Sequence, residues 1–216
     1  MKKLFVCLAN SRKYSGRCVA GVETDNSTQE FKMNPETGRP QWIRPVTTRE
    51  HGEVPHDLVW RLKVGDLVEM EAHSPCPNGY QSENFMIPAQ APKAIGKACL
   101  ERIEQLAENH LPTLFGNRGK AIPREHIEKY NYSLTLIRVE DVRIYFKERE
   151  RNIQPRMLFI FNHNQYDLPV TDLDFILDYR QNNDILIGAN AIYLTISLSM
   201  LHEDWYYKLV AGVLIV

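Results

Sequence analysis

Regular alternation of apolar and polar residues in the second half of the chain constrains its fold more than any other feature. Apolar side chains recur at alternate positions through residues 133–148. This period of two is typical of a long strand, because successive side chains of a strand point to opposite faces. Residues 156–161 and 166–170 continue as further strand-like runs, and the turn-forming sequence NHNQ at 162–165 separates them. The pattern predicts three consecutive strands.

A helix and two more strands are predicted to follow. Thr171 precedes the helical segment 172–181, whose first turn is acidic. A threonine N-cap followed by acidic residues favours the start of a helix. Residues 191–199 and 205–216 then have the composition of two closing strands. Three strands, a helix and two strands are the element order of the OB-fold, a small Greek-key barrel.

The first half of the chain shows the same order less clearly. Strands are predicted at residues 3–8, 17–23, 41–46, 66–72 and 84–87, with a short helix at 55–62 before the fourth strand. The stretch VAGV occurs at 19–22 and again at 210–213, a weak sign of duplication. We therefore predict a mainly β protein with a helical connector, built of two tandem OB-like five-stranded Greek-key barrels at residues 1–91 and 131–216.

Residues 92–130 are predicted to be the helical connector between the barrels. Apolar residues recur at helical spacing over residues 92–110, which predicts an amphipathic helix packed against one or both barrels. They are Ile95, Cys99, Ile103 and Leu106. A second short helix is predicted at 123–129.

The charge balance narrows the class of partner. The 216 residues carry a net charge of −1, so no global cationic field favours indiscriminate binding of nucleic acid. Any anion site must therefore be local. The four cysteines are scattered without a C-x-x-C pair, and no secretory signal is recognisable at MKKLFVCLAN. The longest apolar run is shorter than the roughly 20 residues of a membrane span. We expect reduced thiols in a cytoplasmic protein without membrane contact.

The most basic part of the chain coincides with the stretch ANSRKYSGRC at residues 9–18, since every charged residue before position 18 is basic. Two interpretations carry roughly equal weight: a solvated hairpin tip, or a loop that binds an anion. Gly16 would give the backbone freedom to turn its amide groups toward an oxyanion. The candidate ligand-binding residues are Asn10, Ser11, Arg12 and Arg17.

The sequence QWIRPV at residues 41–46 places Trp42 and Arg44 on one face of a predicted strand. An aromatic plane beside a guanidinium is suited to stacking on a base and pairing with a phosphate. The alternative, which we favour slightly, is that Trp42 belongs to the core and Arg44 pairs with an acid such as Glu53 or Glu69.

A second aromatic and cationic stretch, WYYK, lies in the last predicted strand. Trp205 and Lys208 are candidate ligand-binding residues, because they combine a stacking surface with a cation. In the alternative interpretation, of about equal weight, the aromatic residues pack across the closing strands and Lys208 extends its amine to solvent.

No stretch predicts an active site or a metal centre. His73 and Cys76 form half of a zinc-binding pattern without a matched second pair. The acidic residues Asp172, Asp174 and Asp178 are explained by the helix dipole and by solvation. We therefore expect no catalytic residue, no bound metal and no cofactor.

Three stretches together resemble a known family: LANSRKYSGRCVAGVE, WIRPV and YLTISLSMLHEDWYYKLVAGVLI. They resemble the bacterial dual OB-domain proteins, which are named for two OB-folds in tandem. Some members are placed in anti-phage or other conflict systems as candidate ligand sensors. The connection SMLHED at residues 199–204 is bulkier and more acidic than the resemblance implies, which raises the question whether Lys208 faces an open pocket. By this resemblance the motif positions are Asn10, Ser11, Arg12, Gly16, Arg44 and Lys208.

The combined prediction is a non-enzymatic binding module. Its ligand would be a nucleotide or a short nucleic acid, sensed on behalf of an effector protein encoded elsewhere, with Arg12 or Arg17 converging on Arg44. Near-zero net charge favours a compact ligand over a long electrostatic groove. The alternative is an adaptor or assembly subunit whose barrels contact only protein, and a nucleotide-processing enzyme is a distant third.

Overall fold

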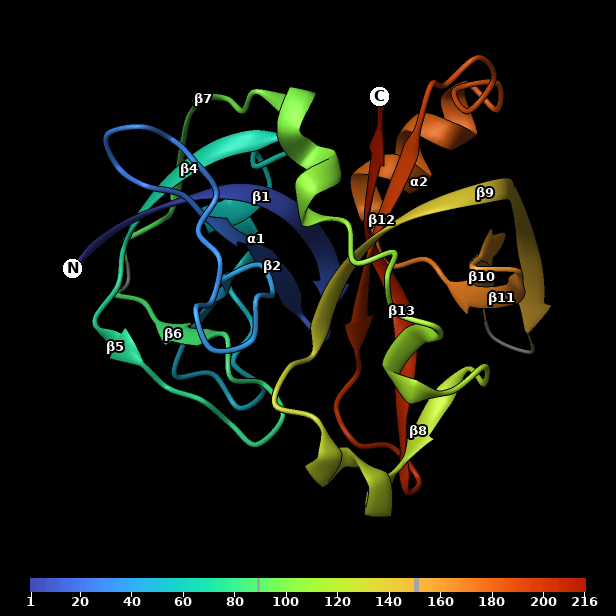
Figure 1. The fold of residues 1–216 in the computed structure, drawn as a ribbon, viewed down its shortest axis with the longest axis horizontal. Helices are drawn as coiled ribbons and strands as arrows, with labels where there is room; N and C mark the ends of the chain where they lie inside the picture. Colours follow the sequence, from blue (N-terminus) through green and yellow to red (C-terminus); the bar gives the residue numbers. More distant parts are fainter. Residues whose placement is uncertain (89, 150–151) are drawn as a thin grey trace. The chain divides into compact units, whose positions relative to one another are not determined.

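The computed structural model describes residues 1–88, 90–149 and 152–216. The chain forms two compact units, Met1–Leu106 and Ala107–Val216. Each unit is built mainly of strands, and its helical segments are short (Figure 1). The residues predicted as the connector, 92–130, are shared between the two units.

The first unit contains a seven-stranded sheet with the strand order β5-β6-β3-β2-β1-β4-β7. Neighbouring strands run antiparallel except β3 and β6, which run parallel. The pairing of the first strand with the fourth is the arrangement expected of an OB-like barrel. The elements are β1 (Lys2–Lys13), β2 (Gly16–Glu23), β3 (Trp42–Val46), α1 (His56–Val59), β4 (Asp66–Glu71), β5 (Ser74–Pro75), β6 (Asn84–Met86), β7 (Lys93–Lys97) and the 3-10 helix η1 (Leu100–Leu106).

Alternation along the strands of the first unit sends one set of apolar side chains into its core. Phe5 and Cys7 of β1 and Val19 of β2 are fully buried there. Side chains from β3, α1 and β4 and from the segments beside them complete this core: Ile43, Val54, Val59, Leu62, Val68, Met70, Ala72 and Ile87.

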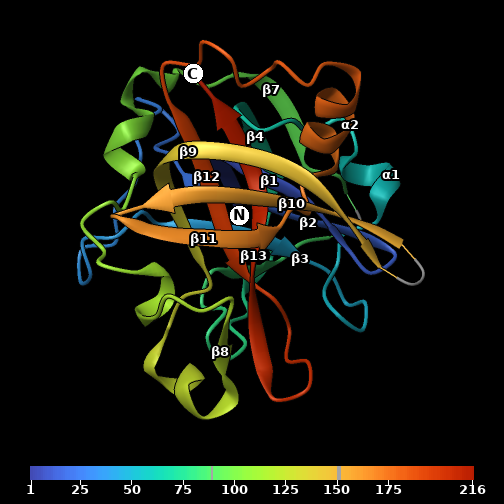
Figure 2. The same cartoon turned by 90° about the vertical axis from the view of Figure 1, so that its right-hand side faces the viewer.

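The second unit contains a six-stranded sheet with the order β11-β10-β9-β12-β13-β8. Its strands β9, β10 and β11 lie side by side in Figure 2. The elements are η2 (Leu114–Gly116), β8 (Ala121–Pro123), η3 (Arg124–Lys129), β9 (Leu134–Arg149), β10 (Asn152–Phe161), β11 (Asn164–Pro169), α2 (Leu173–Gln181), β12 (Ile192–Leu198) and β13 (Trp205–Ile215).

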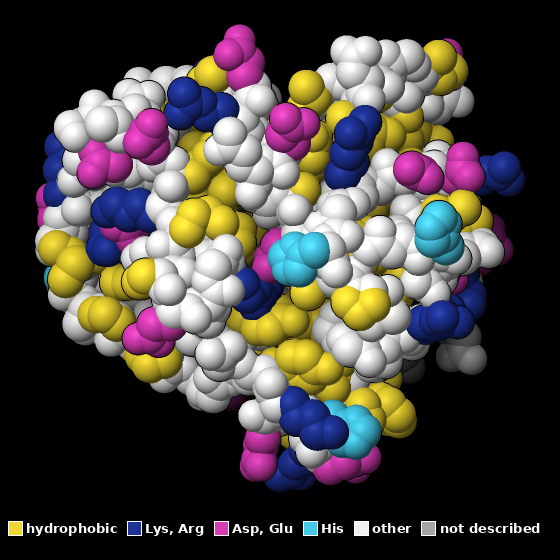
Figure 3. All heavy atoms as spheres, viewed as in Figure 1, with side chains coloured by type: hydrophobic (Ala, Val, Ile, Leu, Met, Phe, Trp, Pro, Cys, Tyr) yellow, Lys and Arg dark blue, Asp and Glu magenta, His cyan; other side chains and the backbone are white. Residues whose placement is uncertain are grey.

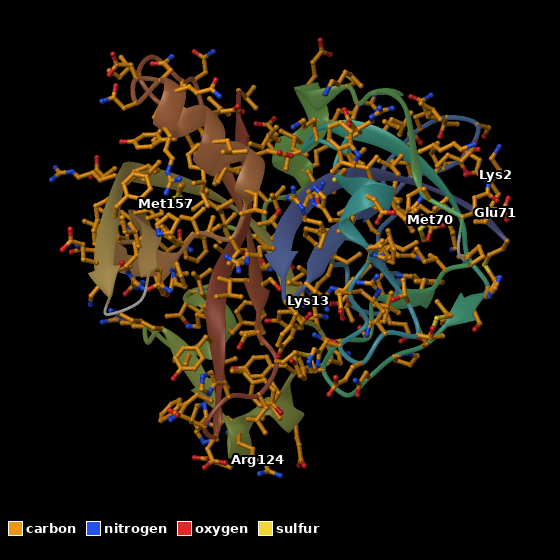
Figure 4. The ribbon with its side chains drawn as sticks, turned by 180° about the vertical axis from the view of Figure 1, so that it is seen from behind. Lys2, Lys13, Met70, Glu71, Arg124 and Met157 are labelled. Atoms are coloured by element: carbon orange, nitrogen blue, oxygen red, sulfur yellow. The ribbon has the colours of Figure 1, made fainter. Side chains whose placement is uncertain are left out.

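The third and fifth strands of the second unit's OB-like core meet, as they do in an OB barrel. Val170, directly after β11, forms a parallel bridge with Val210 of β13. The backbone N–H of Thr171 donates to the carbonyl of Val210 at 2.8 Å. Met157 (Figure 4) and Phe159 are fully buried in this unit. The predicted mainly β fold of two tandem OB-like domains is confirmed.

Helix α2 begins at a different residue from the one predicted to cap it. Asp172, not Thr171, is the N-cap, and its carboxylate accepts from the N–H of Phe175 at 3.1 Å. The second carboxylate oxygen accepts from the N–H of Val213 at 2.9 Å. Burial raises the pKa of Asp172 to about 6 despite these bonds. The Thr171 hydroxyl instead donates to the carbonyl of Val210 at 3.2 Å.

One predicted helix is replaced by two other elements. In place of a helix over residues 92–110, the structure has strand β7 paired with β4, followed by the 3-10 helix η1. Ile95 is 54 % exposed on β7, whereas Ile103 and Leu106 are buried. The helical spacing therefore predicted the buried residues of η1 correctly, but it did not predict strand β7. The short helix predicted at 123–129 is the 3-10 helix η3.

Candidate ligand-binding site

The beginning of ANSRKYSGRC is buried in the framework of the first unit. The side-chain amide of Asn10 donates to the carbonyl oxygens of Val59 at 2.9 Å and Leu62 at 2.7 Å. Carbonyl groups at a helix end lack partners within the helix, so these bonds hold the end of α1 on β1. The Ser11 hydroxyl, in a side chain that is also buried, donates to the carbonyl of Cys18 at 3.5 Å. Both predicted ligand contacts are therefore used within the fold.

Arg17 is also part of this framework. Its Nε donates to Nδ1 of His56 at 3.1 Å, and its Nη1 donates to the carbonyl of Asn10 at 3.2 Å. Arg17 is only 4 % exposed. Arg12 is its direct partner across the hairpin, so both side chains leave on the same face, but Arg12 is exposed.

Arg44 lies on the opposite face of the sheet from Arg17. The register of β2 and β3 pairs Gly21 with Ile43 and Val22 with Trp42, so Arg44 shares a face with the even-numbered residues of β2. Arg12 and Arg17 share the other face. The predicted convergence of Arg12 or Arg17 on Arg44 therefore does not occur.

Arg44 forms a buried ion pair. Its Nη2 lies 2.9 Å from Oε1 of Glu83, and the side chains are 2 % and 4 % exposed. Burial opposes the charge of Arg44, but attraction to Glu83, Cys18 and Tyr80 outweighs it and raises the pKa of the guanidinium. Trp42 on the same face is buried as well. This is the alternative interpretation of the strand, with Glu83 in place of the acids Glu53 and Glu69 that the sequence suggested.

The exposed part of the hairpin is its tip. Tyr14, with a positive φ of 48°, forms the turn between β1 and β2. Its ring stacks on the imidazole of His51 with centroids 3.7 Å apart and planes 23° apart. Tyr14 is 57 % exposed, and Arg49, in the loop that carries His51, is exposed too. We call Arg12, Lys13, Tyr14, Arg49 and His51 the hairpin-tip surface.

Glycine is required at position 16 because no room exists there for a side chain, and not because the backbone has an unusual angle. A side chain at this position would overlap the carbonyl oxygen of Val54. Arg17 and Val54 exchange backbone hydrogen bonds of 2.9 Å in both directions. Glycine therefore lets the hairpin approach the segment before α1, which brings the tip and the loop at residues 47–53 together.

The electrostatics of the hairpin-tip surface combine cations with one buried acid. Ser15 donates from its hydroxyl to Oε1 of Glu53 at 3.3 Å. Burial would raise the pKa of Glu53, but hydrogen bonds from backbone and Ser15, with the charge of Arg49, lower it. Burial, with the charge of Arg44, lowers the pKa of Lys13 although Cys18 and Glu53 act against this. Figure 4 shows Lys13 at the end of β1.

Only some residues of the hairpin-tip surface could be predicted from the sequence. Tyr14 lies inside the stretch ANSRKYSGRC, but it is exposed because it stands in the turn between β1 and β2. Arg49 and His51 follow β3 and reach Tyr14 only because of the close approach at Gly16. Spacing along the chain does not predict that contact.

In the second unit, Lys208 is completely buried. Its Nζ donates to the backbone carbonyl and to the Oδ1 of Asn117, both at 2.8 Å, and lies 5.6 Å from the ring centroid of Tyr166. Burial lowers the pKa of Lys208 to about 7. The amine neither reaches solvent nor lines an open pocket; it holds the loop around Asn117 on β13.

Trp205 and Lys208 occur on opposite faces of β13, because they are three positions apart. Trp205 is 44 % exposed and Tyr207, on the same face, is 37 % exposed. The ring of His202 contacts Tyr207 edge-on with centroids 6.2 Å apart. These two predicted site residues therefore do not act on one ligand within this unit.

The described residues were also searched for metal sites, disulfide bonds and membrane-spanning helices. Residues 1–88, 90–149 and 152–216 contain no group of three or more His, Cys, Asp or Glu side chains placed to hold a metal ion. None of the four cysteines, all of which lie in these ranges, forms a disulfide bond. Within the same ranges, no helix has the length and apolarity needed to cross a bilayer. Figure 3 shows acidic and basic side chains interspersed on the face viewed.

Comparison with known proteins identifies the family. The family described as "DuOB: Dual OB-containing domain" matches residues 3–213. The chain belongs to the dual OB family. A search of curated proteins gives no match for this dual OB chain.

Two solved structures align with the whole dual OB chain at low similarity. One is titled "Crystal structure of the tetrameric p202 HIN2", with 11% identity, a TM-score of 0.32, and coverage of 100% of this chain and 93% of that chain. The other is titled "Molecular basis for abrogation of activation of pro-inflammatory cytokines", with 10% identity, a TM-score of 0.32, and coverage of 100% and 92%.

The family places the hairpin tip at a recognisable position of the fold. In the first OB-fold of this dual OB chain, Tyr14 and Ser15 form the loop between strands one and two. OB-folds bind oligonucleotides and oligosaccharides with the face of strands two and three and with the loops beside it. Two OB-folds in tandem fit a binding module.

Proposed function

We propose that the protein is a non-enzymatic module that binds a nucleotide or a short nucleic acid at the hairpin-tip surface. The observation that supports this most is the exposed ring of Tyr14, which stacks on the half-buried imidazole of His51. A base can continue such a stack, because every base offers a π-face to an aromatic ring. Arg12 and Arg49 are both exposed, and each lies two positions before one residue of this pair. Their guanidinium groups can bind the phosphate of the ligand.

The charge at the tip supports a compact ligand. The hairpin tip and the loop at residues 47–53 contain three cations, Arg12, Lys13 and Arg49, and two acids, Glu50 and Glu53. This small excess of cations suits one or a few phosphates and not a long backbone. In this proposal, occupation of the tip is read by an effector protein encoded elsewhere.

Isothermal titration calorimetry with nucleotides and short oligonucleotides, at low and moderate salt, tests the proposal. Tyr14→Ala is expected to reduce affinity by about 1–3 kcal/mol, the usual contribution of one stacked base. Arg12→Gln combined with Arg49→Gln is expected to lower the affinity and to make it less dependent on the salt concentration. Arg102→Gln is the matched control, since Arg102 is an exposed arginine of the same unit on η1, 3.3 Å from Glu30.

Unchanged binding in both tip variants would contradict the proposed site. If no nucleotide or oligonucleotide binds, and the purified chain forms a stable complex with another protein, the adaptor function is the better description. Arg44 is unsuitable for these variants, because removing one partner of a buried ion pair destabilises the fold itself.

A further inference from the structure

Strands β9, β10 and β11 form a regular array of side chains on the outer face of the second unit. Met157 and Phe159 point into the core, so the even-numbered residues of β10 point outward. The register pairs Gln154 with Lys147, Arg156 with Tyr145, and Leu158 with Arg143. On the other side of β10, Arg156 faces Pro169 and Leu158 faces Asp167. We call these eight side chains the outer face of β9–β11.

One cation of this face is held rigidly. Arg156 donates from Nε to Oδ1 of Asp167 at 2.7 Å and from Nη2 to the carbonyl of Asp167 at 2.6 Å. Its Nη1 donates to Oε1 of Gln154 at 3.1 Å. Arg156 is only 5 % exposed. It therefore forms the fixed floor of the face next to Tyr145.

A single acid serves several cations here. Burial would raise the pKa of Asp167, but hydrogen bonds from Arg156, Tyr145 and Lys120 lower it, so it is ionised at neutral pH. Lys120 lies 3.3 Å from the Asp167 carboxylate and is itself largely exposed. The charge of Asp167 is thus shared between Arg156 and Lys120, and its carboxylate holds the Tyr145 hydroxyl.

The outer strand of the face presents a cation, an aromatic ring and a second cation in alternation. Arg143, Tyr145 and Lys147 are all exposed, with Tyr145 at 39 %. Neither Arg143 nor Lys147 has an acidic side chain within 4.0 Å among the residues that the structure describes. Their Cα atoms are separated by four positions, about 13 Å along a strand. Along β9, Glu148 after Lys147 points to the opposite face, whereas Glu140, before Arg143, lies opposite Ile160 at the far end of this face.

We propose that the outer face of β9–β11 binds an extended single-stranded nucleic acid. Arg143 and Lys147 contact its phosphates, and a base stacks on Tyr145 between them. Cations that follow a backbone, interrupted by an exposed ring, are the arrangement that single strands require. A folded protein partner would place its own acids opposite the cations, but it would not explain a fixed, exposed ring between them. This site lies in a different unit from the hairpin-tip surface and does not depend on it.

Fluorescence anisotropy with labelled 12-nucleotide oligothymidylate and oligouridylate tests the proposal on the full chain at several salt concentrations. Arg143→Gln combined with Lys147→Gln is expected to reduce the slope of log K against log salt by about 1.4, at about 0.7 per lost phosphate contact on a single strand. Tyr145→Ala is expected to weaken binding by about 5- to 150-fold. Tyr145→Phe keeps the ring and is expected to retain binding.

Arg124→Gln is the matched control in the same unit, because Arg124 is an exposed arginine outside the face, 3.7 Å from Asp204. Circular dichroism of each variant excludes loss of folding as the cause. If the Arg143, Lys147 and Tyr145 variants bind as the parent does while Tyr14→Ala abolishes binding, the outer face is overturned and the hairpin-tip site stands. If Tyr145→Phe loses as much affinity as Tyr145→Ala, stacking is overturned. Absence of oligonucleotide binding by the parent chain overturns the outer face outright.

Discussion

Individual residues of the conspicuous stretches divide into framework and surface by burial. Arg44 looks like a ligand-binding cation in the sequence, but its Nη2 lies 2.9 Å from Glu83 in a pair that is almost fully buried. A charge in such a place requires a partner, because the cost of removing an ion from water is large. Tyr14 had no prominence in the sequence, yet its ring is exposed and stacked. Residue type alone does not distinguish these two outcomes.

The buried amine of Lys208 makes the stability of the second unit depend on pH. Its pKa is about 7 in the fold against 10.5 for an ordinary lysine, so folding favours the neutral form. Below about pH 7 the charged amine opposes folding fully, and this cost falls as the pH rises toward 10.5. We expect the parent chain to gain on the order of 2 kcal/mol of unfolding free energy between about pH 7 and pH 9 from this group.

Urea denaturation of the parent and of Lys208→Met at the two pH values measures this contribution. The variant loses two hydrogen bonds to Asn117 at every pH, so the comparison concerns the change with pH and not the absolute stability. We expect that change to be smaller in Lys208→Met. Parallel pH profiles of the two proteins would show that Lys208 titrates normally.

At the scale of elements, the β1–β2 hairpin depends on close contact at Gly16. Gly16→Ala places a methyl group against the carbonyl of Val54, which belongs to the backbone and cannot move cheaply. Overpacking of this kind costs about 1–3 kcal/mol, and we expect a loss of that size in denaturant titration. Gly96→Ala in β7 is the control, because nothing lies within 4 Å of the added carbon. Equal stability of the two variants would contradict the close approach.

Strands with a buried face could be predicted from the sequence, whereas short exposed strands could not. The long strands β9 and β13 are rich in apolar, strand-favouring residues, and parts of both are buried on both faces: residues 134–137 of β9 and 210–214 of β13. The five residues of β7 are all exposed, so its sequence shows no alternation of apolar and polar residues. This segment is a strand because it pairs with β4. The apolar spacing across this segment instead suggested a helix.

The face of each strand residue was predictable, but the register between strands was not. Alternation correctly placed Trp42 and Arg44 on one side of β3. Whether Arg17 shares that side depends on how β2 aligns with β3, and no local pattern fixes that alignment. The partner of Arg44, Glu83, is distant in sequence and reaches it through β6, which runs parallel to β3. The outer face of β9–β11 depends on two registers, that of β9 with β10 and that of β10 with β11, and was missed for the same reason.

At the scale of the whole molecule, each unit has what an independent domain needs. The core cluster around Phe5, Val19 and Val68 lies entirely within Met1–Leu106. Met157 and Phe159 are fully buried in a sheet whose strands all belong to Ala107–Val216. A chain that contains its own sheet and core can fold alone.

We therefore expect the fragments 1–106 and 107–216, expressed separately, to fold. Each should unfold cooperatively in urea with an m-value of about 1–3 kcal/mol/M, typical of a domain near 100 residues. Circular dichroism and urea titration of the fragments measure this. A fragment without a cooperative transition would show that its core is completed by the rest of the chain. Folded fragments would also separate the two proposed sites, because the hairpin-tip surface lies wholly in the first and the outer face of β9–β11 wholly in the second.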